Sequence, residues 1–265
     1  MNWLSKQASD TQITHGQRIW LYFLAAVIMF LLVFPTLIVI PMSFSDSQYL
    51  EFPPEKWSIR WYEEYWETPR WINATITSLQ VAFFTMLLAT PIGTMAAYGL
   101  FVSGSKFGRY VFFLLMTPMI IPVILIAIGT FYVFGKVGVV NSIPGLVLAH
   151  TVLAVPIVMI IMTSALRTYD LNQELVARSL GASRIRAFFS ITLPQIKFSI
   201  IISALFAFLT SFDEVIISIF LSGGGNSTLT KQMFNALRDY IDPTIAAIST
   251  LMIILSTSLM LGAQY

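Results

Sequence analysis

The chain has 265 residues, of which 57% are hydrophobic and only 11% are charged, and its formal net charge is +2. Soluble globular domains carry about 25% charged residues, so this composition excludes a protein whose whole surface faces water. The net charge is too small to indicate nucleic-acid binding. Because the chain has no cysteine, disulfide scaffolds and cysteine-rich metal sites are also excluded. The composition therefore predicts a protein embedded in membrane lipid along its whole length.

Six long apolar segments follow one another between charged residues. A helix needs about 20 apolar residues to cross a bilayer, and runs of this length without alternation do not suit barrel strands. We therefore expect an all-α membrane protein with spans at about 19–42, 72–102, 110–134, 143–166, 198–221 and 244–261. Residues 1–18 would form a tail before a membrane domain of residues 19–265. The first apolar run is too long for the core of a secretory signal, so we expect it to be retained as a span.

Basic residues in the connections favour a cytoplasmic N-terminus and a cytoplasmic C-terminus. In this orientation the inner segments hold nine Lys and Arg residues and the outer segments hold six, in agreement with the excess of positive charge on the cytoplasmic side of membranes. The first outer connection, 43–71, contains four tryptophans. Tryptophans of this kind gather at membrane interfaces, so this connection is expected to lie at the outer surface.

The connection 167–197 is much longer than the other inner connection, 103–109. Within it, small and apolar residues recur at helical spacing: Val176, Leu180, Ser183 and Ala187. Glu174 and Arg178 stand four residues apart, which favours an ion pair on a helix, and Gly181 interrupts the helix where a bend is easy. We expect a short amphipathic helix that lies on lipid or fits a groove in a partner protein.

The spacing of Gly181, Ile191, Leu193 and Pro194 resembles the cytoplasmic signature of permeases from binding-protein-dependent ABC importers. In that family the loop forms a coupling helix that sits in a cleft of the ATPase subunit, and the resemblance implies the type I importer permease fold. The residues that it implies for ATPase coupling are Glu174, Ala177, Arg178, Gly181, Ala182, Ser183, Ile191, Leu193 and Pro194. The usual pattern has its Glu six residues before the Gly, so Glu174 is displaced by one residue, which is about 100° around a helix.

Other segments resemble one subgroup of this family. The segments 57–62 and 73–74 are similar to the first outer loop and the second span of the family's permeases. The segments 212–223, 228–229 and 238–243 look most like the second of two paired permeases in importers of polyamines such as spermidine and putrescine. Relatives that import opines, amino-acid derivatives or iron share much of this pattern. The resemblance therefore favours a polyamine and leaves these other solutes open.

The resemblance also implies the surroundings of the chain. It implies a second permease subunit that is a different but similar chain, two ATPase subunits, and a solute-binding protein in the periplasm or outside the cell, all at a bacterial inner membrane. The sequence has no phosphate-binding loop of the Walker type, so we expect no cofactor on this chain and ATP and Mg on the ATPase subunits. With two histidines and no cysteine, we expect no metal site.

Asp213 and Glu214 are the only acids within an expected span. A charge in mid-membrane costs about 2.5–3.5 kcal/mol on insertion scales, which favours a function in the solute path over a neutralised structural pair. Adjacent residues point about 100° apart on a helix, so we expect one acid to face the path and the other to face a neighbouring helix or subunit. A carboxylate there would favour an ammonium group. Phe212 and Phe220 are candidates for cation–π contacts with it, with packing as their alternative role.

Two other functional classes are alternatives to the importer. An intramembrane enzyme would use His150 with a serine, but no nucleophile motif accompanies this histidine, and we expect it to form hydrogen bonds between helices. A secondary transporter would show internal repeats, and the two halves of the chain have no convincing similarity. An intramembrane enzyme would also leave the connection 167–197 unexplained, so we expect a transport subunit that is not an enzyme.

Overall fold

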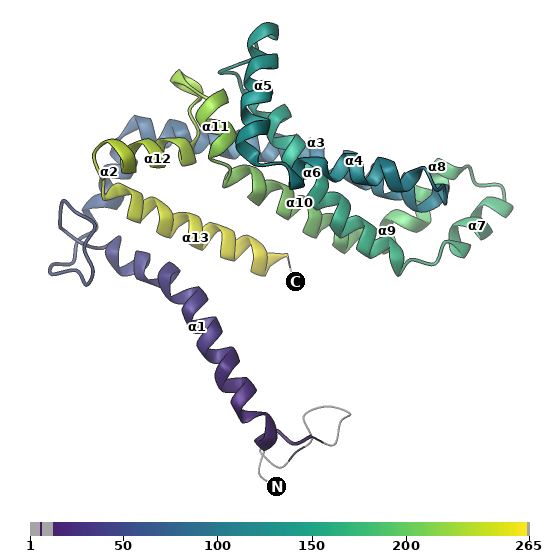
Figure 1. Cartoon of the computed structure of the whole chain (residues 1–265), viewed down its shortest axis with the longest axis horizontal. Helices are drawn as coiled ribbons and strands as arrows, with labels where there is room; N and C mark the ends of the chain where they lie inside the picture. The colour runs from purple at the N-terminus through teal and green to yellow at the C-terminus, as the bar shows by residue number, and fades with distance from the viewer. Residues whose placement is uncertain (1–5, 7–12, 264–265) are drawn as a thin grey trace. The chain divides into compact units, whose positions relative to one another are not determined.

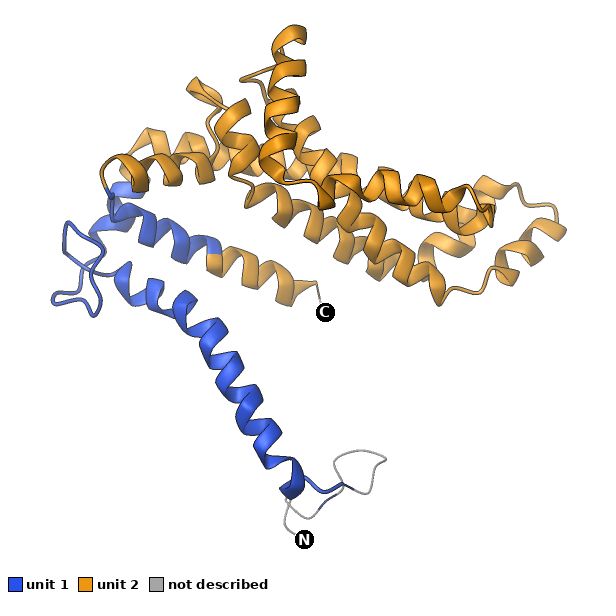
Figure 2. Cartoon of the chain, in the orientation of Figure 1, with its two compact units in different colours: residues 1–65, 241–252 blue, residues 66–240, 253–265 orange. Residues whose placement is uncertain are grey.

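The computed structural model describes Lys6 and residues 13–263, and the chain divides into two compact units (Figures 1 and 2). Unit 1 consists of residues 1–65 and 241–252, and unit 2 of residues 66–240 and 253–265. Most of the expected N-terminal tail, residues 1–18, lies outside the described residues; its last part, η2 (Gly16–Arg18), is a short 3-10 helix. The described residues form helices and their connections, with no named strand among them. The all-α class is therefore confirmed.

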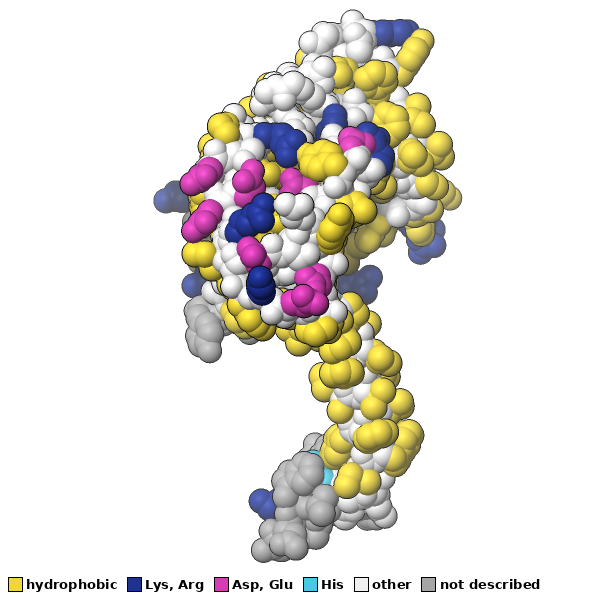
Figure 3. Space-filling view, turned by 90° about the vertical axis from the view of Figure 1, so that its left-hand side faces the viewer, with side chains coloured by type: hydrophobic (Ala, Val, Ile, Leu, Met, Phe, Trp, Pro, Cys, Tyr) yellow, Lys and Arg dark blue, Asp and Glu magenta, His cyan; other side chains and the backbone are white. Residues whose placement is uncertain are grey.

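Unit 1 begins with α1 (Ile19–Met42), a helix of 24 residues. None of its side chains, all of which are described, is buried, and Figure 3 shows hydrophobic side chains along it. A helix that is apolar on all sides requires an apolar environment. α1 is therefore suited to lipid or to the membrane helices of another subunit.

Aromatic side chains hold together the connection that follows α1. The Tyr62 hydroxyl on α2 (Arg60–Glu67) lies 2.7 Å from the Ser43 hydroxyl. The indole N–H of Trp61 donates to the Ser47 carbonyl over 3.1 Å. These bonds fix the short α2 against the end of α1, which suits an ordered interfacial loop more than a free linker. The sequence did not predict α2.

Unit 2 is built around α3 (Pro69–Ser103), α6 (Ile143–Arg167) and α10 (Lys197–Phe212), which pack on one another (Figure 1). α3 and α6 approach closely at Gly93, where an added Cβ would lie 2.6 Å from a methyl carbon of Val158. Small residues at helix interfaces allow such contact in membranes. The resulting core has one cluster around Met159 and Met162, and a second around Leu146 and Ile217.

Among the described residues, four helical segments are long and apolar enough to cross a membrane: 16–42, α3, α6 and α13 (Thr244–Gly262). Two bent pairs bring the number to six if each pair is one span, which agrees with the expected six. The first pair is α4 (Gly108–Ile120) and α5 (Val123–Val137), bent by 98°. Ile121 is extended, with ψ 135°, because the following Pro122 disfavours helical geometry. The expected span 110–134 is therefore interrupted at Pro122 and consists of two helices.

The second pair is the segment 184–195 and α10, bent by 79°. The fifth expected span, 198–221, is also not a single helix. α10 ends at Phe212, residues 213–215 are not helical, and α11 (Ile216–Leu221) follows and packs on α5. After a short 3-10 helix, η4 (Gly224–Asn226), comes α12 (Leu229–Asp239), which the sequence did not predict. The N–H of Leu229 donates to the Ser78 hydroxyl over 2.8 Å and attaches α12 to α3.

Candidate functional site

The connection 167–197 forms a compact set of short helices at one end of the α3–α6–α10 bundle (Figure 1). They are α7 (Asn172–Ser179), α8 (Arg184–Ala187), the π-helical turn η3 (Phe188–Thr192) and α9 (Leu193–Gln195). Gly181 ends α7 with φ +94°, a left-handed conformation that favours glycine. The Ser183 hydroxyl then accepts the Arg186 N–H over 3.3 Å and caps α8. Glycine and serine therefore define the turn between α7 and α8.

Glu174 is the anchor of α7 and is only 1% exposed. Both of its carboxylate oxygens lie 2.7 Å from the Tyr98 hydroxyl of α3, which donates to them. The Thr192 hydroxyl of η3 donates to the same carboxylate over 3.0 Å, and the Tyr169 hydroxyl lies 3.0 Å from that of Thr192. Hydrogen bonds to a buried carboxylate are among the stronger ones in proteins. One side chain thus ties α7 both to a spanning helix and to η3.

The opposite side of α7 exposes apolar side chains. Leu175, Val176 and Leu180, called here the exposed apolar face of α7, are open to the surroundings, with Leu180 84% exposed. The expected stripe that continues to Ala187 is wrong, because α7 ends at Ser179 and Ala187 is buried. The expected ion pair of Glu174 is wrong as well, since no salt bridge joins it to Arg178 among the described residues.

The remaining coupling candidates surround this face. Arg178, Gly181, Ser183 and Pro194 are exposed, and Ala177, Ala182, Ile191 and Leu193 are half-buried. Their role in coupling stays a prediction.

Asp213 and Glu214 occupy the break between α10 and α11. Together with Leu209 and Thr210 they line an open pocket of about 370 Å³. The expectation that only one acid would face a cavity is wrong, because the helix ends at Phe212 and the 100° rotation between helical neighbours no longer applies. The pocket therefore combines two adjacent carboxyl groups.

The two acids differ in their surroundings. Glu214 accepts the N–H of Ile217 over 3.0 Å, which engages one of its oxygens at the start of α11. Asp213 is exposed, and its carboxyl group has no hydrogen bond or ion pair within the described part of the chain. Asp213 lies directly after the C-terminus of α10, where the helix dipole is negative. The pocket is thus electrostatically suited to a cation such as an ammonium group.

A polar network supports the break. The imidazole of His150 lies 2.8 Å from the Ser211 hydroxyl before the break and 3.5 Å from the Ser218 hydroxyl after it. The Glu214 carbonyl, freed from helical bonding, accepts the hydroxyls of Ser218 and Thr230 over 3.1 and 2.9 Å. Broken helices are tolerated in membranes where neighbours satisfy the freed backbone groups. His150 joins helices, as expected from its position in a span.

The two phenylalanine candidates do not line this pocket. Phe212 is buried and stacks on Phe208 with 5.7 Å between ring centres, and Phe220 is half-buried against the second core cluster. Their cation–π role stays a prediction. Tyr98 and Thr192 could not be recognised from the sequence as partners of Glu174, because they stand 76 and 18 residues away along the chain and carry no local signal.

Comparison with known proteins relates this architecture to transporters. Residues 89–265 match the family model described as binding-protein-dependent transport system inner membrane component. The chain is 30% identical over 248 residues to the spermidine/putrescine transport system permease protein PotC of Haemophilus influenzae. The aligned residues make up 92% of this chain and 96% of that protein. It is 31% identical over 226 residues to the putrescine transport system permease protein PotI of Escherichia coli. This alignment includes 83% of this chain and 80% of that protein.

Among solved structures, the structure of this chain resembles that of a chain from a bacterial ABC transporter involved in the import of the acidic polysaccharide alginate. The TM-score is 0.73 at 12% identity, over 94% of this chain and 98% of the other. A second structure, of a bacterial alginate ABC transporter in complex with an alginate pentasaccharide-bound periplasmic protein, gives a TM-score of 0.70 at 15% identity, over 94% and 93% of the two chains. At this identity the likeness shows the fold, which is that of an ABC importer permease.

Proposed function

Since this chain belongs to the family of binding-protein-dependent transport system inner membrane components, we propose that the solute it helps to import is a polyamine such as spermidine or putrescine. Family membership makes the chain a permease subunit of an ABC importer and not an enzyme. The observation that carries the choice of solute is the pair Asp213 and Glu214 lining one pocket at the break of a spanning segment. The names of the relatives PotC and PotI support the same choice.

Charge is what selects the solute in this proposal. Polyamines carry several ammonium groups, and the attraction of such a group to a carboxylate at 4 Å grows from about 1 kcal/mol in water to about 4 kcal/mol near a protein surface. An oxyanion or the carboxylates of an opine would instead be repelled by Asp213 and Glu214. The pocket is open, and we propose that the second permease supplies the opposite wall.

The proposed assembly has a second, similar permease chain, two ATPase subunits that bind ATP and Mg, and a solute-binding protein. The exposed apolar face of α7 supports an ATPase contact, because an apolar helix face fits a groove in a partner. The uncovered α1 supports burial in lipid or against the second permease. ATP-driven movement of α7 would shift the permease pair between inward-open and outward-open states, as a two-state equilibrium biased by ligands.

The solute is tested with the complete importer in liposomes that contain ATP, with the binding protein outside. We expect uptake of labelled putrescine or spermidine that competes with unlabelled polyamine and stops when a non-hydrolysable ATP analogue replaces ATP. The matched comparison uses an opine, an amino acid and ferric iron under the same conditions. Uptake of one of these without any polyamine uptake would refute the polyamine assignment and leave the family assignment intact.

We further propose that both termini are cytoplasmic in a bacterial inner membrane, so that α7 faces the ATPase. Because the chain has no cysteine, single cysteines can be placed without background at the exposed positions Gln48, Gly225, Ser105 and Ser179. In intact cells an impermeant maleimide should label Gln48→Cys and Gly225→Cys only. All four variants should react after permeabilisation, which controls for accessibility. Labelling of Ser179→Cys in intact cells would reverse the proposed orientation.

A further inference from the structure

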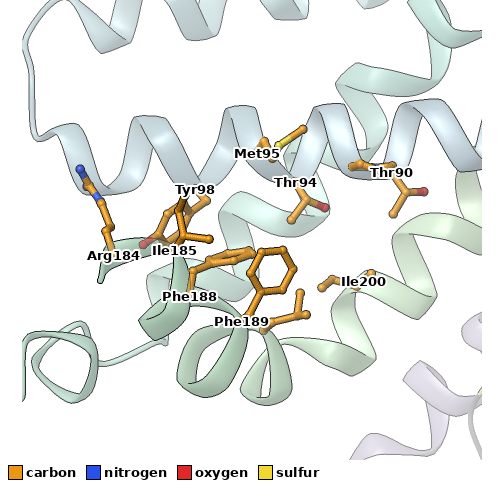
Figure 4. Close-up of a pocket in the computed structure, with 11 residues that line it drawn as sticks. Thr90, Thr94, Met95, Tyr98, Arg184, Ile185, Phe188, Phe189 and Ile200 are labelled. Atoms are coloured by element: carbon orange, nitrogen blue, oxygen red, sulfur yellow. The ribbon is translucent and has the colours of Figure 1, made fainter. Parts of the chain in front are cut away.

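A second pocket, of about 520 Å³, lies between α3 and the segment from α8 to the start of α10 (Figure 4). Its volume falls within the range of roughly 300–1,000 Å³ that is usual for small-molecule sites. Met95 on α3 faces Phe188, Phe189 and Ile200 on the other side. The walls are therefore apolar and shaped by two segments that the sequence places about a hundred residues apart.

The chemistry of this pocket is opposite to that of the Asp213 pocket. Arg184 is the one charged side chain among its described lining residues, and no carboxylate lines it. Glu174 does not line the pocket, and its carboxylate accepts the hydroxyls of Tyr98 and Thr192. The one charge on the lining is therefore positive, which favours an anionic group over an ammonium group. The pocket instead suits a molecule with a long apolar part and an anionic end.

Two buried hydroxyls indicate where polar atoms of such a molecule would lie. The hydroxyl oxygens of Thr90 and Thr94 are buried and have no hydrogen-bond partner among the described residues, although both side chains line the pocket. Figure 4 shows Arg184 and Tyr98 at one end, with Thr94 and then Thr90 further along α3. At 1.5 Å per residue, the two threonines lie about 6 Å and about 12 Å along the axis from Tyr98.

We propose that this pocket binds an anionic phospholipid. The phosphate contacts Arg184, the ester carbonyls below it accept the hydroxyls of Thr94 and Thr90, and an acyl chain lies along Phe189 and Ile200. Tyr98 stands about 7.5 Å along the helix axis from the end of α3 at Ser103, so the Arg184 side of the pocket is the side nearer to this end of the helix. Basic pockets between membrane helices bind anionic headgroups in this way.

A lipid in this position would brace α8 and η3 against α3, beside the contacts of Glu174. The segment that carries α7 would then be held by a membrane component as well as by protein. The lipid composition of the membrane would thereby affect coupling without any contact with the transported solute. This inference needs only that the chain spans the membrane, so it stands or falls separately from the polyamine assignment.

The test uses the complete importer in nanodiscs that contain phosphatidylglycerol with a photoreactive group in its acyl chain. We expect cross-links to the peptides that contain Phe189 and Ile200. Arg184→Gln should lower this cross-linking about fivefold, as expected for one basic contact with an anionic headgroup. Arg186→Gln, an exposed arginine on the same helix that does not line the pocket, should leave it unchanged. Photoreactive phosphatidylcholine should cross-link less than phosphatidylglycerol.

Thr94→Val provides a second variant that keeps side-chain size and removes the hydroxyl. If Arg184→Gln does not assemble with the ATPase, a fall in cross-linking for Thr94→Val supports the proposal and an unchanged yield overturns it. Met95→Trp should block the pocket and abolish the cross-links. The proposal is overturned by cross-links that map elsewhere, by equal yields from both lipids, or by a photoreactive residue at Met95 that captures another protein subunit instead of lipid.

Discussion

Replacing Glu174 by alanine should reduce solute uptake at least about tenfold while the ATPase subunits still hydrolyse ATP. The variant removes a carboxylate that is 1% exposed and accepts the hydroxyls of Tyr98 and Thr192. Each hydrogen bond to a charged group contributes about 1.5–3 kcal/mol, and each hydroxyl left without a partner costs about 1–3 kcal/mol. The free energy lost with these hydrogen bonds is large enough to lower the population of the state in which α7 is bound to α3 and η3 more than tenfold.

The measurement compares uptake with ATP hydrolysis stimulated by the binding protein. Glu174→Gln keeps one acceptor oxygen and should fall between alanine and the wild type. Tyr98→Phe removes only the donor on α3 and should reproduce part of the loss. Asn172→Ala truncates an exposed side chain on the same helix and should behave as the wild type. Normal coupling in Glu174→Ala, with normal amounts in the membrane, would mean that these bonds do not hold α7 for its function.

Asp213→Asn is expected to raise the KM for polyamine uptake about tenfold or more. Its carboxyl group is exposed, lines the pocket and has no protein partner in the described part of the chain, so its charge is available to an ammonium group. A charge pair at 4 Å contributes between about 1 kcal/mol in water and about 4 kcal/mol near a protein surface, and 1.4 kcal/mol corresponds to tenfold. The variant changes charge with almost no change in shape.

Glu214→Gln should have a smaller effect, because its amide oxygen can still accept the N–H of Ile217. Glu214→Ala loses that bond as well and should also weaken assembly, which separates the structural part of Glu214 from its charge. The control is Asp239→Asn on α12, an exposed acid paired with Arg238 at 2.8 Å and remote from the pocket lining. If Asp213→Asn and Glu214→Gln both import polyamines at wild-type rates, the acids are structural.

Glu174 is an example of a site residue that could be predicted only in part from the sequence. Its position next to the Gly181 turn could be predicted, since the motif and the helix period are local properties of the chain. Its orientation could not, because local spacing favoured Arg178 as its partner. In the structure the carboxylate turns inward to Tyr98, which stands 76 residues away. No short-range pattern distinguishes these two partners.

The break after Phe212 illustrates the same limit. Hydropathy predicted one span over 198–221, since every residue but two in its centre is uncharged. The helix nevertheless ends there because His150 on α6 bridges Ser211 and Ser218, and Thr230 satisfies the freed carbonyl of Glu214. The consequence is functional, because a continuous helix would point the two acids in different directions.

The sequence by itself determined the membrane class, the number of apolar segments and the position of the long connection 167–197. These properties follow from the length of apolar runs and from spacing along the chain, and hydrocarbon leaves a run of about 20 apolar residues few alternatives to a helix. Only the tertiary structure decided where spans bend, which way Glu174 faces, and that both acids share one pocket. Those features depend on hydrogen bonds between residues far apart in sequence, whose partners are chosen by packing and not by local pattern.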